Sequence, residues 1–404
     1  MDEKAQAGPE TAHDHEPQAD PAAPLHGDTT QPPAADVGDS PLSPAGVQRG
    51  LGLWLLLLLA GGGATLILGH TEGAALIAVA GLFALAQASD AAAAFAVYRD
   101  WVHRDFPRRS FVGILVRTLV RAIVPVAGAL MYLGLAAFAL QDSPGANQKL
   151  AALWCRGAAV VCLALAWRPL ADTITRLLFR GGSPGRDVGR TRRLTARVFV
   201  IAMLAPVPAQ LLLHDLLRTL KDSGTALADP GALLAQLAGE VLIALAGVGL
   251  FVRRDLRATL ERLGLTRMSG RDLAIAAAGF AAAFGVNGGM EWIERTYLPA
   301  LYATDSEATK LIAANLSVMA SIVLGVSAGA GEEITVRGAL QPRLGIVLSA
   351  ILFAAGHLQY TWFGMLTIAL LGVVLGLIRS RANTTTAILV HSSYDLVAAL
   401  TAGH

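Results

Sequence analysis

Eleven runs of mostly apolar residues follow one another from residue 51 onward, separated by shorter polar segments. A helix needs about 20 mostly apolar residues to cross the hydrocarbon core of a bilayer, and lipid offers its backbone groups no other partners. The sequence therefore predicts an all-α, polytopic transmembrane helix bundle of about 8–11 spans. The candidate spans are residues 51–69, 73–97, 122–140, 150–170, 197–213, 232–252, 272–289, 309–329, 344–357, 362–379 and 385–401.

The charge content supports a membrane protein. Only 15% of the 404 residues are charged, whereas 54% are hydrophobic. Soluble domains carry about 25% charged residues. So few charged side chains cannot cover a water-exposed surface, which argues against a soluble two-domain enzyme.

The first 49 residues differ from the rest of the chain. They contain nine acidic residues against Lys4 and Arg49, a net charge of −7, and eight of the 18 prolines. Such a segment cannot bury enough apolar surface to fold, so residues 1–49 are expected to form a disordered acidic, Pro/Ala-rich tail. The tail has no basic start followed by an apolar core and is therefore not read as a cleavable signal peptide.

Arginines gather in every second loop between the runs. The loops near His70, Asp142 and Asp305 contain few of them. By the positive-inside rule, the arginine-rich loops and the N-terminal tail are cytoplasmic. The abundance of Ala, Arg and Gly points to a bacterial cytoplasmic (inner) membrane. The basic loops lack interleaved aromatic residues, so no nucleic-acid partner is expected. The loop arginines are Arg99, Arg104, Arg108, Arg109, Arg180, Arg186, Arg190, Arg192, Arg193, Arg197, Arg253, Arg254, Arg257, Arg262, Arg267, Arg271, Arg379 and Arg381.

Other polar and small residues inside the runs have structural explanations. Cys155 and Cys162 lie on one helical face, too far apart to bridge, and are expected to be reduced. Gly372 and Gly376 form a GxxxG pattern, which is typical of closely packed helices. Isolated charged residues are expected to reach water near span ends or to pair between helices. These residues are Asp90, Arg156, Arg168, Asp172, Glu240 and Glu291.

The last 75 residues concentrate polar groups in a way that isolated pairs do not explain. Glu333 and Arg337 are four residues apart on one helical face, with Glu332 turned about 100° away. His391 and Asp395 share a face by the same spacing. Each charged side chain costs roughly 2.5–3.5 kcal/mol at a helix centre, so one shared, water-filled site explains them jointly. The six polar residues are Glu332, Glu333, Arg337, His357, His391 and Asp395.

The order of these residues follows a known pattern. EExxxR at 332–337, FxxxH at 353–357 and HxxxD at 391–395 resemble the motifs of the CPBP family of intramembrane glutamic proteases. That family includes the CAAX prenyl endopeptidases and the bacterial Abi proteins. The resemblance begins near Arg271. It implies a protease core at 271–404, after an N-terminal transmembrane bundle at 50–270.

The resemblance also implies roles for the site residues. Glu332 is the general base that activates water, assisted by His357, and His391 with Asp395 supports the oxyanion. Glu333 and Arg337 would position the first motif. Asp395 stands where prenyl endopeptidases have Asn. Because an ionised Asp cannot donate a hydrogen bond, Asp395 is expected to orient His391, which weakens a specific prediction of CAAX cleavage.

Two other chemistries fit parts of the sequence. Residues 325–329 read GVSAG, so a rhomboid-like serine protease would use Ser327 with His391 or His357. The hydrolase elbow with this motif needs a strand-to-helix turn, whereas the segment here reads as a helix. A zinc protease would use Glu332, His357 and His391, a legitimate ligand set, but HExxH is missing. The resemblance implies a metal-free reaction without cofactors.

The predicted function is hydrolysis of a peptide bond in a membrane-associated protein or peptide, by C-terminal processing or CAAX-like cleavage. The expected partners are that membrane-anchored substrate and the lipid bilayer. A non-catalytic membrane scaffold or immunity protein, which keeps the motifs but acts by binding, is the alternative outside enzymology. Nothing in residues 1–270 selects the substrate.

Overall fold

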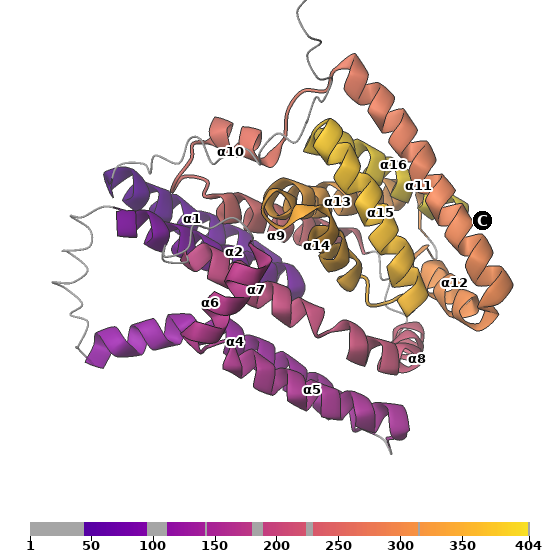
Figure 1. The fold of residues 1–404 in the computed structure, drawn as a ribbon, viewed down its shortest axis with the longest axis horizontal. Helices are drawn as coiled ribbons and strands as arrows, with labels where there is room; N and C mark the ends of the chain where they lie inside the picture. The colour runs from indigo at the N-terminus through magenta and orange to yellow at the C-terminus, as the bar shows by residue number, and fades with distance from the viewer. Residues whose placement is uncertain are drawn as a thin grey trace, which may run out of the picture. The chain divides into compact units, whose positions relative to one another are not determined.

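The computed structural model describes residues 44–94, 111–141, 144–179, 189–223, 229–313 and 316–402. The described residues belong to one compact unit, residues 39–404, and every element named in it is a helix (Figure 1). The predicted all-α architecture is therefore confirmed for the part of the chain that the structure describes. The predicted disordered tail lies outside the described residues up to residue 43, and the first helix begins at Pro44 rather than near Leu51.

The helices before residue 270 are α1 (Pro44–Ile67), α2 (Thr71–Ala94), α4 (Phe111–Ala139), α5 (Ala146–Ala164), α6 (Arg168–Leu178), α7 (Arg190–Met203), α8 (Pro206–Ser223), α9 (Pro230–Val248) and α10 (Leu256–Leu263). The helices after it are α11 (Gly270–Tyr297), α12 (Pro299–Ala313), α13 (Val318–Glu332), the π-helical segment η1 (Glu333–Leu340), α14 (Gln341–Ala355), α15 (Trp362–Arg381) and α16 (Thr384–Ala402).

The chain is a multi-pass integral membrane protein. In the described ranges, seven helical segments are long and apolar enough to cross a membrane, or nine if each of two bent pairs counts as one span. The bent pairs are α5 with α6, at 98°, and α7 with α8, at 45°. They correspond to the predicted spans 150–170 and 197–213. The second break falls at Pro206, because proline lacks the N–H that would continue the preceding helix.

The predicted spans 309–329 and 344–357 differ from the structure. The first straddles the end of α12 at Ala313 and the start of α13 at Val318. From there the chain continues as one helical element to Ala355, interrupted at Gly345, whose φ of 80° is strained for residues with a Cβ. The predicted span 385–401 corresponds to α16, which does not pass the hydropathy criterion that the seven segments meet.

Helix α9 holds a central place in the described unit. It packs against α2, where a Cβ on Gly239 would overlap the side chain of Leu76. At its C-terminal end, the side chains of Gln87 and Arg343 both donate to the carbonyl of Gly247. Donors from α2 and α14 therefore fix this helix end, whose carbonyls have no partner within the helix.

Small residues set the closest contacts among the C-terminal helices. A Cβ on Gly329 would lie 2.7 Å from the backbone nitrogen of Ser392, so α13 and α16 approach almost to backbone contact. Gly372 and Gly376 bring α15 close to Ala350 and Ile346 of α14, where added Cβ atoms would lie 3.1 and 2.8 Å from the nearest side-chain atoms. The packing role predicted for the GxxxG pattern is confirmed.

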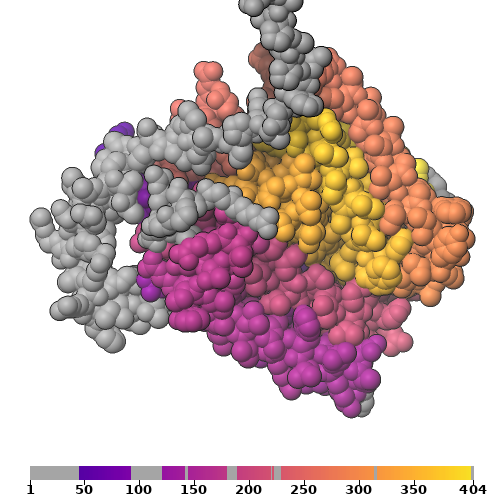
Figure 2. Space-filling model, viewed as in Figure 1, coloured from indigo at the N-terminus to yellow at the C-terminus, as the bar shows by residue number. Residues whose placement is uncertain are grey.

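Two buried features involve the helices before residue 270. Cys155 and Cys162 are both buried and free, as predicted. In Figure 2, the magenta to pink surface of the helices before residue 270 meets the gold to yellow surface of the C-terminal helices. An apolar cluster joins α7 with α14. The buried members of this cluster are Phe179, Ala196, Phe199 and Leu344.

Candidate active site

The first motif lies where α13 passes into the π-helical segment η1. Glu332 ends α13, and Glu333 begins η1. π-Helical segments are rare and occur frequently at functional sites. The ion pair that the spacing suggested is present, with Glu333 Oε2 and Arg337 Nε 3.4 Å apart and both side chains fully buried.

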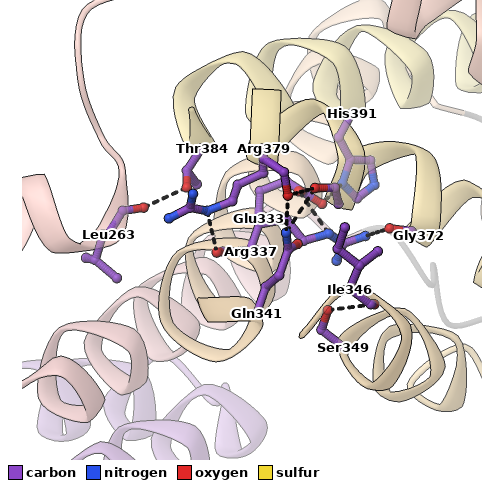
Figure 3. Close-up of polar contacts among 12 residues, drawn as sticks. Leu263, Glu333, Arg337, Gln341, Ile346, Ser349, Gly372, Arg379, Thr384 and His391 are labelled. Carbon is purple, nitrogen blue, oxygen red and sulfur yellow. Dashed lines mark hydrogen bonds and ion pairs between the residues drawn. The ribbon is translucent and has the colours of Figure 1, made fainter. Parts of the chain in front are cut away.

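Two neighbouring helices hold Arg337 (Figure 3). Its Nη2 donates to the carbonyl of Gly372 on α15 at 3.2 Å. Its guanidinium carbon lies 4.4 Å from the ring centroid of Phe353 on α14, a cation–π contact. Arg379 Nε donates to the backbone carbonyl of Arg337 at 3.2 Å. The absence of a side chain at Gly372 allows this approach, so the GxxxG residues also build the site.

His391 links the first motif to the last. Its Nδ1 lies 3.0 Å from Glu333 Oε1, and its Nε2 lies 3.3 Å from Asp395 Oδ2. A ring that donates to acceptors from both nitrogens is the imidazolium form. Glu333 therefore bridges Arg337 and His391, and a continuous buried network runs from Arg337 to Asp395, whose side chain is 24% exposed.

His357 follows the end of α14. Its Nδ1 lies 2.9 Å from the carbonyl oxygen of Phe353. Because a carbonyl only accepts, Nδ1 carries the proton, and in the neutral ring Nε2 keeps its lone pair. The Phe353 ring lies 4.9 Å from the His357 ring and 5.7 Å from the His391 ring, centroid to centroid. Phe353 thus stands between the two histidines and Arg337.

Glu332 lies beside this network and outside its hydrogen bonds. Its Oε2 is buried and has no hydrogen-bond partner among the described residues. A buried polar atom without a partner is costly, and such atoms in native folds indicate a functional role or an ordered water. The structure thus places Glu333, Arg337, His391 and Asp395 in direct contact, and it leaves Glu332 with an oxygen available to another molecule.

One acidic residue reaches the same region from the N-terminal half of the chain. Glu240 on α9 was expected to reach water or to pair between helices. Its Oε1 instead accepts from Gln236 on its own helix at 2.8 Å, and its Oε2 is buried without a partner in the described structure. A Cβ on Gly331 would overlap that carboxylate, which therefore lies against α13 one residue before Glu332. The sequence offered one signal for this contact, since Glu240 is a carboxylate in the middle of the predicted span 232–252.

The residues of the serine motif, 325–329, lie where α13 packs against α16. Ser327 is 4% exposed, and in the described part of the chain its Oγ has no hydrogen-bond partner. Its flanking residues Gly325 and Gly329 pack against α16. Both nitrogens of His391 face carboxylates, which leaves neither for Ser327. The helical conformation also lacks the turn that a nucleophilic elbow needs.

The predicted zinc ligands are not gathered around one point. Within the described ranges, no group of three or more His, Cys, Asp and Glu side chains is placed to hold a metal ion. His391 directs both ring nitrogens at carboxylates rather than at a common centre with Glu332 and His357. The ligand set suggested by the sequence therefore does not fit zinc.

Comparison with known proteins identifies the segment that carries this site. Residues 314–397 match the family model described as type II CAAX prenyl endopeptidase, Rce1-like. No curated protein and no solved structure matches the chain. The matched segment contains all six polar residues of the three motifs, from Glu332 to Asp395. Residues 314–397 are therefore similar to the type II CAAX prenyl endopeptidases, in agreement with the resemblance of the three motifs to the CPBP family.

Proposed function

We propose that this protein is a glutamic intramembrane endopeptidase, in which Glu332 activates water to hydrolyse a peptide bond of a membrane-anchored protein or peptide. The observation that carries the proposal is the contrast between two adjacent carboxylates. Glu333 faces His391 at 3.0 Å and Arg337 at 3.4 Å, the second contact being an ion pair without a hydrogen bond. Glu332 forms no ion pair in the described structure, and its Oε2 is buried without a hydrogen-bond partner. A carboxylate with one unoccupied oxygen in a buried site is suited to take a proton from water.

His357 and His391 take different parts in this reaction. His357 directs its proton-bearing Nδ1 at a carbonyl, so Nε2 serves to orient the attacking water. His391, held as an imidazolium between Glu333 and Asp395, supports the oxyanion through its positive charge, which favours the oxygen that becomes negative when the carbonyl is attacked. Asp395, as an acceptor, acts through His391.

Each step uses groups of the chain and the water. The water forms the new C–O bond while its proton passes to Glu332. The C–N bond then breaks as that proton passes to the leaving amine, which restores Glu332. We propose a reaction without cofactors, as the resemblance to the glutamic proteases implies.

The substrate and the orientation belong to the same proposal. By the positive-inside rule, we propose that the N-terminus and the arginine-rich loops are cytoplasmic. The abundance of Ala, Arg and Gly favours a bacterial inner membrane. The substrate is a protein or peptide held at the bilayer, because the site lies on helices of a membrane bundle. Both C-terminal processing and CAAX-like cleavage suit this description.

The test is cleavage by the purified full-length protein in liposomes. Three probes separate the substrate classes: a farnesylated CAAX peptide, the same peptide without the lipid, and a transmembrane peptide with a C-terminal extension. Glu332→Gln should lower turnover of the cleaved probe by about 10²–10⁴-fold, the usual contribution of a general base. The matched control is Glu72→Gln, which changes an exposed glutamate in the first turn of α2 and should leave turnover unchanged.

Two outcomes would contradict the proposal. Full activity of Glu332→Gln would exclude Glu332 as the base, and loss of activity in Ser327→Ala alone would favour the serine mechanism. Inhibition by strong chelators with recovery on zinc addition would restore the metal mechanism. A cellular phenotype that survives Glu332→Gln would indicate a scaffold that acts by binding.

A further inference from the structure

The carboxylate of Glu240 comes from α9, outside the segment that matches the family model. Two contacts bring it to the helix that carries Glu332. The backbone carbonyl of Glu240 accepts from Thr335 Oγ1 at 3.0 Å. Its side chain lies against Gly331, where a Cβ would overlap Oε2. Glu240 therefore meets this helix one residue before Glu332 and again three residues after it.

Glu240 and Glu332 each have one carboxylate oxygen without a hydrogen-bond partner in the described structure. In the described structure, the Oε2 atoms of both Glu240 and Glu332 are buried without a partner. The other oxygen of Glu240 accepts from Gln236. The carboxylates come from different helices, which makes the arrangement a product of tertiary packing.

Two charged residues of the motifs concern Glu240. Glu332 directly follows Gly331, which the Glu240 carboxylate touches, and His391 belongs to the same group of polar residues. His391 is already bonded to Glu333 and Asp395. The further charged residues on the elements packed against α9 are Glu72 and Asp90 on α2, Arg257, Glu261 and Arg262 on α10, and Glu333 and Arg337 on η1.

Those further groups are engaged elsewhere or lie toward helix ends. Arg257 pairs with Glu261, and Arg262 donates to the carbonyl of Gly338. Asp90 accepts from Thr191 at the start of α7, and Glu72 lies in the first turn of α2. Glu332 is thus the acidic group left to interact with Glu240.

Helix α9 has little freedom to withdraw Glu240 from this position. Gln87 and Arg343 anchor the carbonyl of Gly247, and Trp54 Nε1 donates to the carbonyl of Leu250 at 2.9 Å. Two carboxylates held close together in an apolar interior cannot both be ionised without a large electrostatic cost, and such pairs keep one proton between them.

We propose that Glu240 is a positioning residue that shares one proton with Glu332. At rest, the protonated carboxyl of Glu240 donates to the Glu332 carboxylate and keeps that carboxylate ionised and directed at water. During hydrolysis, which rests on the proposed function, the pair takes one proton from the attacking water. The pair returns one proton to the leaving amine, so it ends with the single proton it began with.

The pairing itself is tested without a substrate, by infrared difference spectroscopy of the full-length protein in nanodiscs titrated with acid. Glu332→Gln identifies the carboxyl band of Glu332. In the wild type, this band should titrate in two linked steps, because the pair and not the single residue binds protons. In Glu240→Gln it should titrate in one step. In Glu240→Leu, which removes the donor, its midpoint should rise by about one pH unit, the effect of losing one charge-assisted hydrogen bond.

Glu294→Gln is the matched control, since Glu294 is another buried glutamate, on α11. It should remove its own band and leave the Glu332 titration unchanged. A one-step titration of Glu332 in the wild type, identical to that in Glu240→Gln, would overturn the proposal. Glu240→Gln conserves shape and hydrogen bonding, so the test stands if Glu240→Leu does not fold.

Turnover separates this inference from the function on which it rests. If cleavage follows the proposal, the pH profile of kcat/KM should change in Glu240→Gln, whereas Glu332→Gln should lose activity at every pH. Full activity of Glu332→Gln would refute the proposed function and leave the infrared result intact. An unchanged pH profile in Glu240→Gln, together with an inactive Glu332→Gln, would refute only the role of Glu240 in the reaction.

Discussion

Removal of the Arg337 guanidinium tests the network at its most buried point. Arg337 and Glu333 are both fully buried, with Arg337 Nε 3.4 Å from Glu333 Oε2. Arg337→Leu would keep an apolar side chain of moderate size and leave Glu333 facing His391 alone. It would also remove the donor to the Gly372 carbonyl and the contact with the Phe353 ring.

The expected loss of stability follows from these contacts. Removing one partner of a buried ion pair costs about 3–5 kcal/mol, because the other charge stays buried without compensation. The cation–π contact adds about 0.5–2 kcal/mol. His391 offsets part of this loss, since it still faces Glu333 Oε1 at 3.0 Å. We therefore expect Arg337→Leu to lower the free energy of unfolding by about 3 kcal/mol or more.

Reversible unfolding in mixed micelles with increasing SDS, followed by fluorescence of the six tryptophans, measures this quantity. The matched control is Arg257→Leu, which breaks a pair of the same spacing with Glu261 at 3.0 Å. In that pair, the side chain of Arg257 is 89% exposed. Exposed pairs contribute about 0–1 kcal/mol, so the control should unfold almost as the wild type does.

The double variant Glu333→Leu with Arg337→Leu separates charge from packing. Replacing both partners of a buried pair by apolar residues is often neutral or stabilising, so the double variant should be more stable than Arg337→Leu. If Arg337→Leu lost no more stability than Arg257→Leu, the buried network would not support the fold and the reasoning would be wrong.

Three further predictions concern other contacts. Gly329→Ala should lower the unfolding temperature, because the new Cβ would lie 2.7 Å from the Ser392 nitrogen. Gly285→Ala, which adds a Cβ in open space, should leave the unfolding temperature unchanged, and equal temperatures for the two variants would contradict the proposed packing. Asp305 accepts hydrogen bonds from the backbone nitrogen and the hydroxyl of Thr361, at 2.6 and 2.8 Å, and so holds the loop after His357. Asp305→Ala should therefore lower both the unfolding temperature and the cleavage rate, and a variant with both unchanged would refute this reasoning. His357→Ala should lower kcat about 10²-fold or more with KM nearly unchanged, and a rise in KM alone would assign His357 to binding.

The sequence by itself indicated the class of fold through hydropathy. Long apolar runs in a weakly charged chain leave few alternatives to membrane helices. Hydropathy did not determine where those helices break. It merged the end of α12 with the start of α13 into one predicted span. It also did not reveal that the helix with Glu332 continues through η1 to the interruption at Gly345. An average over 20 residues contains no information about local backbone geometry.

The same division applies to the site. Helical spacing indicated that Glu333 faces Arg337 and that His391 shares a face with Asp395, because positions four apart lie one above the other. The contacts that join these pairs were decided only in three dimensions. Glu333 reaches His391 on α16, and Phe353 stands between the histidines and Arg337.

Two local features of the sequence thus identified the polar residues: their rarity in an apolar chain and their four-residue spacing. Only the packing of the helices decided which of these residues pair and that Glu332 keeps a buried oxygen without a hydrogen-bond partner. The same packing brings Glu240 of α9 against the helix that carries Glu332. The physical reason is the distance along the chain over which each kind of contact forms. Periodicity along one helix fixes neighbours a turn apart, whereas contacts between helices depend on where small residues such as Gly329 and Gly372 allow two backbones to meet.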